Sequence, residues 1–178
     1  MEVELPISKS IANRWLMLQA IHGDGLMPVS AAMPDDVRLL HGALKALQER
    51  RQGEVLTLDL QNCGTAMRFL TAYCAQLPDC EVLLTGAERM QQRPIGQLVD
   101  ALRTLGAEVK YAGKEGFPPL RIHGKALDVA GKVVEMRQLQ SSQFVSALMM
   151  IGVEVRTDCT SPYIYMTGRL IEEYAVRA

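Results

Sequence analysis

The sequence predicts a mixed α/β (α+β) fold in one domain that covers residues 1–178. Apolar residues recur at intervals of three and four along several segments, which is the spacing of amphipathic helices. Short segments rich in β-forming residues lie between them. A chain of 178 residues that is 48% hydrophobic is also long enough to bury a substantial core.

The apolar spacing places the helices, and local residue types mark their ends. Asp35 is a favoured N-cap for the second helix. Pro94 suits the first position of the fourth helix, and Gly106 suits the position just after its end. The expected helices cover residues 10–21, 35–47, 65–77, 94–105, 142–151 and 162–174.

The expected strands fill the intervals between these helices. They cover residues 55–60, 81–85, 107–111, 120–123, 133–136 and 153–157. Glycines and prolines between residues 111 and 120 favour a hairpin there. The order predicts two complete repeated units and a third that begins near Lys132 and lacks a closing hairpin. Such repetition is typical of a pseudo-symmetric domain in which each unit offers a helix start to a common axis.

Composition excludes several classes of function. A net charge of −1 gives no reason to expect nucleic acid or an anionic membrane as a partner. No apolar run reaches the length of a membrane span, and the first residues lack the pattern of a signal peptide. The four cysteines show no metal-site spacing, so we expect reduced thiols, no metal and a cytoplasmic location.

Three helix starts share one chemical character. Residues 8–14, 62–68 and 140–144 each combine small hydroxyl, amide or glycine residues with the start of an apolar helical run, and the first two also carry basic residues. A helix start has free N–H groups and a partial positive charge. If the three starts converge, they form a pocket for a multiply anionic small molecule.

Each of these segments also has a simpler interpretation. The serines and Thr65 are ordinary N-cap residues, and Arg93 ahead of a helix start is compatible with a solvated side chain. Asp35 and Asp36 fit the dipole of their helix better than a metal or acid–base site. Cys63 lies near a helix start, where a thiol pKa is often lowered, but no base is marked to activate it.

Taken in order, the motifs resemble the 5-enolpyruvylshikimate-3-phosphate synthase family over essentially the whole chain. They are residues 5–14, 35–38, 62–68, 89–95, 141–144 and 162–164. The resemblance implies an enolpyruvyl transferase-like domain of βαβαββ units. Family members pair two such domains around a cleft, and this chain resembles the N-terminal one, with the partner domain absent.

The resemblance implies an activity and roles for individual residues. The enolpyruvyl group of phosphoenolpyruvate is transferred to shikimate 3-phosphate in aromatic amino-acid biosynthesis (chorismate biosynthesis), without a cofactor. Catalytic roles fall on Lys9 and Gln143, which contact both substrates. The implied substrate-binding residues are Lys9, Ser10, Arg14, Asn62, Gly64, Arg93, Ser141, Ser142, Gln143, Thr160 and Tyr163.

Two other functions remain open from the sequence. A UDP-N-acetylglucosamine enolpyruvyl transferase shares the architecture, but it usually has Lys-Asn where this chain has Lys9-Ser10. A non-catalytic anion-binding domain is the other alternative. The residues that the partner domain contributes in the family have no match here. We therefore expect this chain to bind shikimate 3-phosphate weakly and to be inactive by itself. We also expect it to be a monomer. The spacing from Gln143 to Tyr163 is also shorter than in the family.

Overall fold

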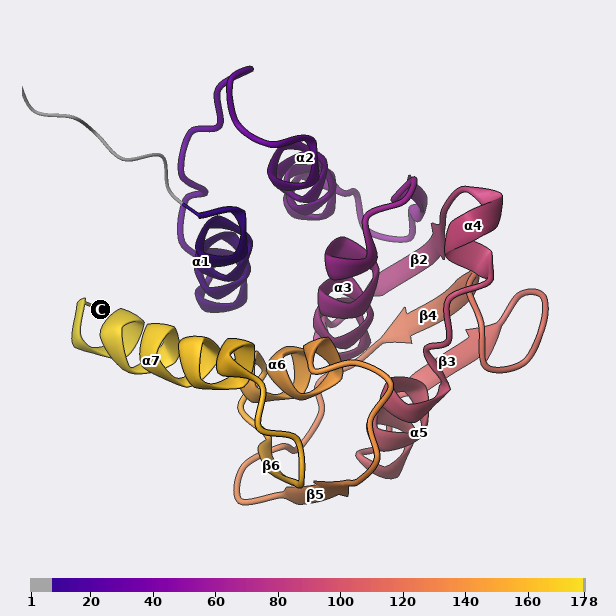
Figure 1. The fold of residues 1–178 in the computed structure, drawn as a ribbon. Coiled ribbons are helices and arrows are strands. Elements are labelled where there is room, and N and C mark those ends of the chain that lie inside the picture. The colour runs from indigo at the N-terminus through magenta and orange to yellow at the C-terminus, as the bar shows by residue number, and fades with distance from the viewer. Residues whose placement is uncertain (1–7, 178) are drawn as a thin grey trace, which may run out of the picture.

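Helices packed around and beside two sheets form the structure, a computed structural model that describes residues 8–177 (Figure 1). The first three residues of the motif at 5–14 therefore lie outside the described residues. The helices are α1 (Lys9–His22), α2 (Asp35–Glu49), α3 (Gly64–Gln76), α4 (Glu88–Gln91), α5 (Gly96–Thr104), α6 (Gln143–Met150) and α7 (Pro162–Arg177). The strands are β1 (Val55–Asp59), β2 (Cys80–Thr85), β3 (Glu108–Tyr111), β4 (Leu120–Gly124), β5 (Val133–Met136) and β6 (Glu154–Thr157).

The larger sheet has the strand order β1-β2-β4-β3. Strand β1 is parallel to β2, whereas β4 is antiparallel to both β2 and β3. Buried and more exposed residues alternate along β2 and β4. Helix α3 contacts both of these strands, so one face of the sheet carries the core and the other is more exposed.

The mixed α/β class is confirmed, and each expected strand is present with small shifts at its ends. The series β1–α3–β2–α5–β3–β4 has the order βαβαββ, interrupted only by the short α4, and β5–α6–β6–α7 begins in the same way. Residues 23–34, between α1 and α2, contain no strand. That the chain is built of repeated units stays a prediction.

Two predicted helix caps are wrong. Helix α2 starts at Asp35 itself, after Pro34, and the Asp35 carboxylate pairs with Arg38 instead of capping. Helix α3 starts at Gly64, and the Sγ atom of Cys63, in place of Thr65, accepts a hydrogen bond of 3.4 Å from the backbone N–H of Ala66. Local propensity favours hydroxyl and carboxyl caps, but the approach of the preceding chain decides which residue takes the position.

The fourth predicted helix begins later than expected. Residues 88–91 form the short helix α4, which the apolar spacing did not predict, and α5 begins only at Gly96. The backbone N–H of Ile95 bonds to the carbonyl of Gly116 at 2.9 Å, in the loop between β3 and β4. That tertiary bond holds residues 92–95 in an irregular connection that carries Arg93.

Helix α3 lies at the centre of the packing. All of its residues except Thr65 and Gln76 are buried, and it contacts α1, α2, α5 and α6 as well as the larger sheet. Helix α6 in turn contacts α1 and α7. Among residues 8–177, no helix combines the length and hydropathy of a membrane span.

Candidate functional site

A cavity of about 410 Å³ opens where the helix starts meet. It is bounded by the first turns of α1, α3, α6 and α7, by the start of α2, and by the connection that precedes α5. Every predicted binding residue except Thr160 lines it. The lining residues are Lys9, Ser10, Asn13, Arg14, Asp36, Asn62, Gly64, Thr65, Arg68, Arg93, Ser141, Ser142, Gln143 and Tyr163.

Three of these helices direct their N-terminal ends toward the cavity. Lys9, Gly64 and Gln143 are the first residues of α1, α3 and α6, and all three line it. The N-cap residues Ser8 and Ser142 make no capping hydrogen bond through their side chains. Uncapped N–H groups and aligned helix dipoles favour an anionic ligand at this position.

The charged side chains in the lining are mostly cationic. Among the described lining residues, Lys9, Arg14, Arg68 and Arg93 are cationic and Asp36 is the one carboxylate. Lys9 Nζ lies 2.8 Å from Oδ2 of Asp36, and this hydrogen bond and charge raise the pKa of Lys9. Asp36 was expected to serve only the dipole of its helix; it lies in the first turn of α2 and also pairs with Lys9.

Arg14 is a buried cation held by neutral groups. Arg14 is only 2% exposed to solvent. Its Nε–H donates a hydrogen bond of 2.7 Å to Oγ1 of Thr167. Nη1 donates to the carbonyl of Ser10 at 3.0 Å, and the guanidinium lies over the rings of Phe69 and Tyr163. Burial lowers the pKa of Arg14 to about 10, so it remains charged near neutral pH. Among residues 8–177 no carboxylate forms an ion pair with it.

Arg68 is a cavity residue that sequence reasoning did not single out. Its Nη1 donates to Oε1 of Gln143 at 3.0 Å, while Nε2 of Gln143 donates to Oγ1 of Thr65 at 2.8 Å. Burial, and secondly the charge of Arg93, lower the pKa of Arg68 to about 10. The available signal was its position one helical turn beyond Gly64, on the same side of α3.

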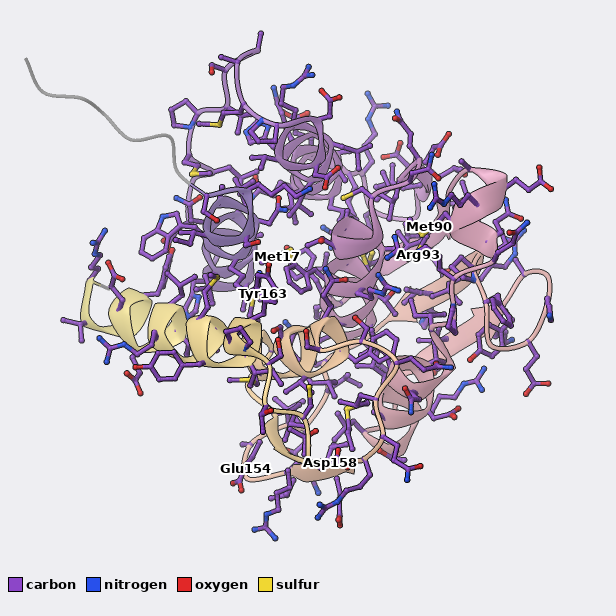
Figure 2. All side chains as sticks on the ribbon, viewed as in Figure 1. Met17, Met90, Arg93, Glu154, Asp158 and Tyr163 are labelled. Atoms are coloured by element: carbon purple, nitrogen blue, oxygen red, sulfur yellow. The ribbon has the colours of Figure 1, made fainter. Side chains whose placement is uncertain are left out.

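Gly64 is the point at which α3 comes closest to the two arginines. A Cβ atom built at this glycine would overlap the guanidinium nitrogens of Arg68 and Arg93 and would lie 2.7 Å from Cζ of Arg93. The missing side chain therefore makes room for both guanidinium groups at the helix start. Figure 2 labels Arg93, beside α4, and Tyr163, at the start of α7.

The segment before α7 differs from expectation. Thr160 is exposed, and the structure does not bring it into the cavity lining with the other predicted site residues. The next residue provides the local bond: Oγ of Ser161 accepts from the backbone N–H of Tyr163 at 3.2 Å. A second residue that sequence reasoning missed is Asn13, which is 1% exposed and lines the cavity; its Oδ1 has no hydrogen-bond partner within residues 8–177.

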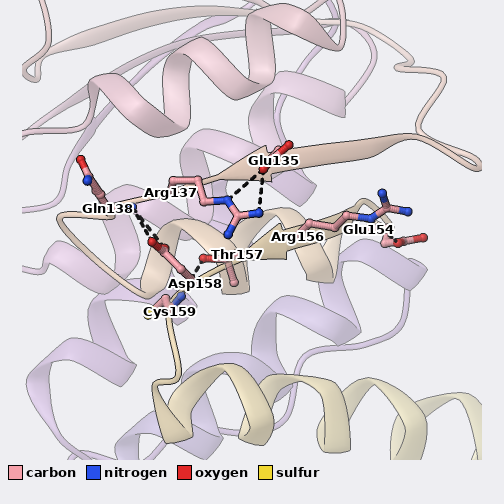
Figure 3. Close-up of polar contacts among 8 residues, drawn as sticks. All are labelled: Glu135, Arg137, Gln138, Glu154, Arg156, Thr157, Asp158 and Cys159. Atoms are coloured by element: carbon pink, nitrogen blue, oxygen red, sulfur yellow. Dashed lines mark hydrogen bonds and ion pairs between the residues drawn. The ribbon is translucent and has the colours of Figure 1, made fainter.

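The loop that carries Ser141 and Ser142 is fixed from two sides. Gln97 of α5 donates through Nε2 to the carbonyl of Gln138 at 3.3 Å, and its Oε1 accepts from the N–H of Gln140 at 3.0 Å. On the other side, the Asp158 carboxylate accepts from the backbone N–H of Gln138 at 3.2 Å (Figure 3). Figure 3 also shows two exposed ion pairs, Glu135 with Arg137 and Glu154 with Arg156, and a half-buried hydrogen bond from the backbone N–H of Cys159 to Oγ1 of Thr157.

The structure does not give Cys63 a reactive character. Burial raises the pKa of the Cys63 thiol, and this effect is larger than the lowering by the hydrogen bond from the N–H of Ala66. The suggestion of a lowered pKa is therefore wrong. Within the part of the chain that the structure describes, no three His, Cys, Asp or Glu side chains gather as a metal site would require.

Comparison with known proteins adds independent information. The sequence model of the family described as EPSP synthase (3-phosphoshikimate 1-carboxyvinyltransferase) matches residues 1–177. A 3-phosphoshikimate 1-carboxyvinyltransferase from Bacteroides fragilis is 40% identical over 99% of this chain and 43% of the relative. One from Shewanella amazonensis is 38% identical over 98% and 46%. The chain thus spans about half the length of the curated relatives it matches.

A solved structure shares the fold. The EPSP synthase from Acinetobacter baumannii matches with a TM-score of 0.71 at 21% identity, over 92% of this chain and 42% of that structure. At this level of identity the match speaks for the fold alone.

Proposed function

Because the chain belongs to the EPSP synthase family, we propose that its cavity binds shikimate 3-phosphate and phosphoenolpyruvate, as one half of a 3-phosphoshikimate 1-carboxyvinyltransferase. The transfer moves the enolpyruvyl group from phosphoenolpyruvate to shikimate 3-phosphate with release of phosphate. The chain corresponds to 43% of the length of the Bacteroides fragilis relative. We place the protein in the cytoplasm as a monomer, and its described cysteines are free thiols.

One observation carries the proposal. The cavity holds four cationic side chains against one carboxylate, and two of the cations, Arg14 and Arg68, are buried without an acidic partner among residues 8–177. Buried charges are normally paired, since an isolated one is costly. A polyanionic ligand supplies the missing negative charge, and both proposed substrates are polyanions.

The residues divide between the two substrates. Ser10, Arg14, Ser141 and Ser142 hold shikimate 3-phosphate, with Tyr163 near its ring. Asn62, Gly64 and Arg93 form the phosphoenolpyruvate site. Lys9 and Gln143 contact both ligands. Thr160 is exposed and lies outside the cavity lining.

Charge is the contribution that this half makes to the chemistry. Asp36 raises the pKa of Lys9, so its ammonium group stays protonated and stabilises negative charge on the reacting groups instead of acting as a base. Addition to the enol also needs a base for the acceptor hydroxyl and a proton for the enol carbon. Asp36, the one carboxylate among the described residues of the cavity lining, forms an ion pair with Lys9. The isolated chain therefore binds substrate without turnover.

Titration calorimetry of the chain with shikimate 3-phosphate tests this proposal. We expect weak, saturable binding that Ser142→Ala reduces by about tenfold, the equivalent of one charge-assisted hydrogen bond. Ser30→Ala, at an exposed position outside the cavity, is the matched control. Absence of binding, or an equal preference for UDP-N-acetylglucosamine, refutes the assignment. Release of phosphate from phosphoenolpyruvate by the chain alone, in the presence of shikimate 3-phosphate, contradicts the expected inactivity.

A further inference from the structure

Two buried hydroxyl groups meet the guanidinium of Arg14 behind the cavity. Oγ1 of Thr167 on α7 accepts from Nε of Arg14 at 2.7 Å and lies 2.8 Å from Oγ of Ser146 on α6. Nη2 of Arg14 lies 3.4 Å from the same Ser146 oxygen. Thr167 and Ser146 are both 0% exposed, and neither belongs to the cavity lining.

The direction of each hydrogen bond follows from the available protons. The Thr167 hydroxyl donates its single proton to the carbonyl of Tyr163 at 2.8 Å. Thr167 is therefore the acceptor toward both Arg14 and Ser146, and the Ser146 proton points to Thr167. The lone pairs of the Ser146 oxygen stay free, and one of them accepts from Nη2 of Arg14. The arrangement satisfies both hydroxyl protons and, among residues 8–177, leaves one N–H on Nη1 and one on Nη2 of Arg14 without a partner.

From this geometry we infer that Thr167, supported by Ser146, is a positioning residue that fixes the Arg14 guanidinium for an anionic ligand. The inference rests on the proposed function for its ligand, shikimate 3-phosphate. Thr167 and Ser146 come from α7 and α6 and Arg14 from α1, so the network also ties three helices to one cation. Neutral acceptors orient the guanidinium without cancelling its charge, which a carboxylate in the same place would do.

Variants at Thr167 separate this role from simple packing. Thr167→Val keeps the shape and removes the acceptor, whereas Thr167→Ser keeps the acceptor. Thr71→Val is the matched control, because Thr71 is also 0% exposed and its hydroxyl also donates to the carbonyl four residues earlier, that of Met67, at 2.6 Å. Thr71 makes no described hydrogen bond to a cavity residue.

Two measurements on the full chain give the readout. Calorimetry with shikimate 3-phosphate is expected to show about tenfold weaker binding for Thr167→Val, which corresponds to about 1.4 kcal/mol. For Thr167→Ser and Thr71→Val we expect the affinity to change by no more than about twofold. Nuclear magnetic resonance of the ligand-free protein follows solvent exchange of the Arg14 Nε–H. We expect faster exchange in Thr167→Val alone.

Unchanged affinity and exchange in Thr167→Val, or equal losses in Thr71→Val, overturn the positioning role. Failure of the wild-type chain to bind shikimate 3-phosphate refutes the proposed function instead. In that case the exchange rate still decides the inference: faster exchange confined to Thr167→Val supports it, and an unchanged rate refutes it.

Discussion

Nη1 of Arg68 donates a hydrogen bond of 3.0 Å to Oε1 of Gln143, although the two residues are 75 positions apart in the sequence. The other end of the Gln143 amide is bound to Thr65. The oxygen and the nitrogen of the Gln143 amide group are both held by side chains from the first two turns of α3. The orientation of the amide is therefore set before a ligand binds. The N-terminal ends of α3 and α6 are connected through this one amide.

Gln143→Glu tests the electrostatic side of this arrangement. The new carboxylate pairs with Arg68 and removes one unit of positive charge from the cavity. We expect binding of shikimate 3-phosphate to weaken by about tenfold or more, with little loss of thermal stability. Calorimetry and thermal unfolding measure the two effects. Gln48→Glu, at an exposed position on α2, is the charge-matched control, and equal losses in both variants contradict the prediction.

Gly64→Ala tests the close approach at the start of α3. The added Cβ overlaps the guanidinium groups of Arg68 and Arg93, which move because they end flexible side chains. We expect the chain to remain folded and the affinity for phosphoenolpyruvate to fall by about tenfold, since displacing one arginine removes a charge-assisted hydrogen bond. Calorimetry with phosphoenolpyruvate, in the presence of shikimate 3-phosphate, gives the comparison.

The control for that substitution is Gly42→Ala in α2. Gly42 is exposed in a helix, and apart from its chain neighbours and the backbone of its own helix no described atom lies within 4 Å of its built Cβ position. Alanine is favoured over glycine in a helix interior by about 1 kcal/mol, so this variant is expected to be more stable and to bind as the wild type does. Weaker phosphoenolpyruvate binding in Gly42→Ala, or unchanged binding in Gly64→Ala, counts against a steric role for Gly64.

A cross-strand pair far from the cavity predicts a pH effect on stability. Glu81 of β2 and His123 of β4 are register partners, and the carboxylate contacts Nδ1 of the ring. The hydrogen bond and charge of Glu81 raise the pKa of His123 above 6.5; Glu108 adds to this shift, whereas Lys125 opposes it. The stabilisation by this pair is fully present below the pKa that His123 has in the unfolded chain. It is lost as the pH rises through the higher pKa that His123 has in the folded protein.

Thermal unfolding of the wild type and of Glu81→Gln between about pH 5.5 and pH 9 measures how much the Glu81–His123 pair stabilises the fold. The variant is expected to unfold at a lower temperature at about pH 5.5, where histidine is charged, and the difference shrinks toward about pH 9, where it is neutral. A difference of the same size at both ends of the range shows that Glu81 acts through something other than the charge of His123.

Sequence reasoning worked best where one local pattern dominates. The apolar spacing located the long helices, and the short β-rich segments located the strands. It failed where a distant group intervenes. The bond from Ile95 to Gly116 delays the start of α5, and burial reverses the expected shift of the Cys63 pKa. Thr160, placed with the site residues by its motif, is exposed and lies outside the cavity lining.

The sequence alone determined the mixed α/β class, the helix starts with their hydroxyl and basic residues, and the family. Those features are local, since a cap, a periodic apolar face or a motif is complete within a few residues. Only the tertiary structure decided that Arg14 and Arg68 are buried, that Thr167 and Gln143 are their partners, and that Asp36 engages Lys9. Burial and long-range contacts arise when helices pack against one another, and no spacing within a single helix specifies them.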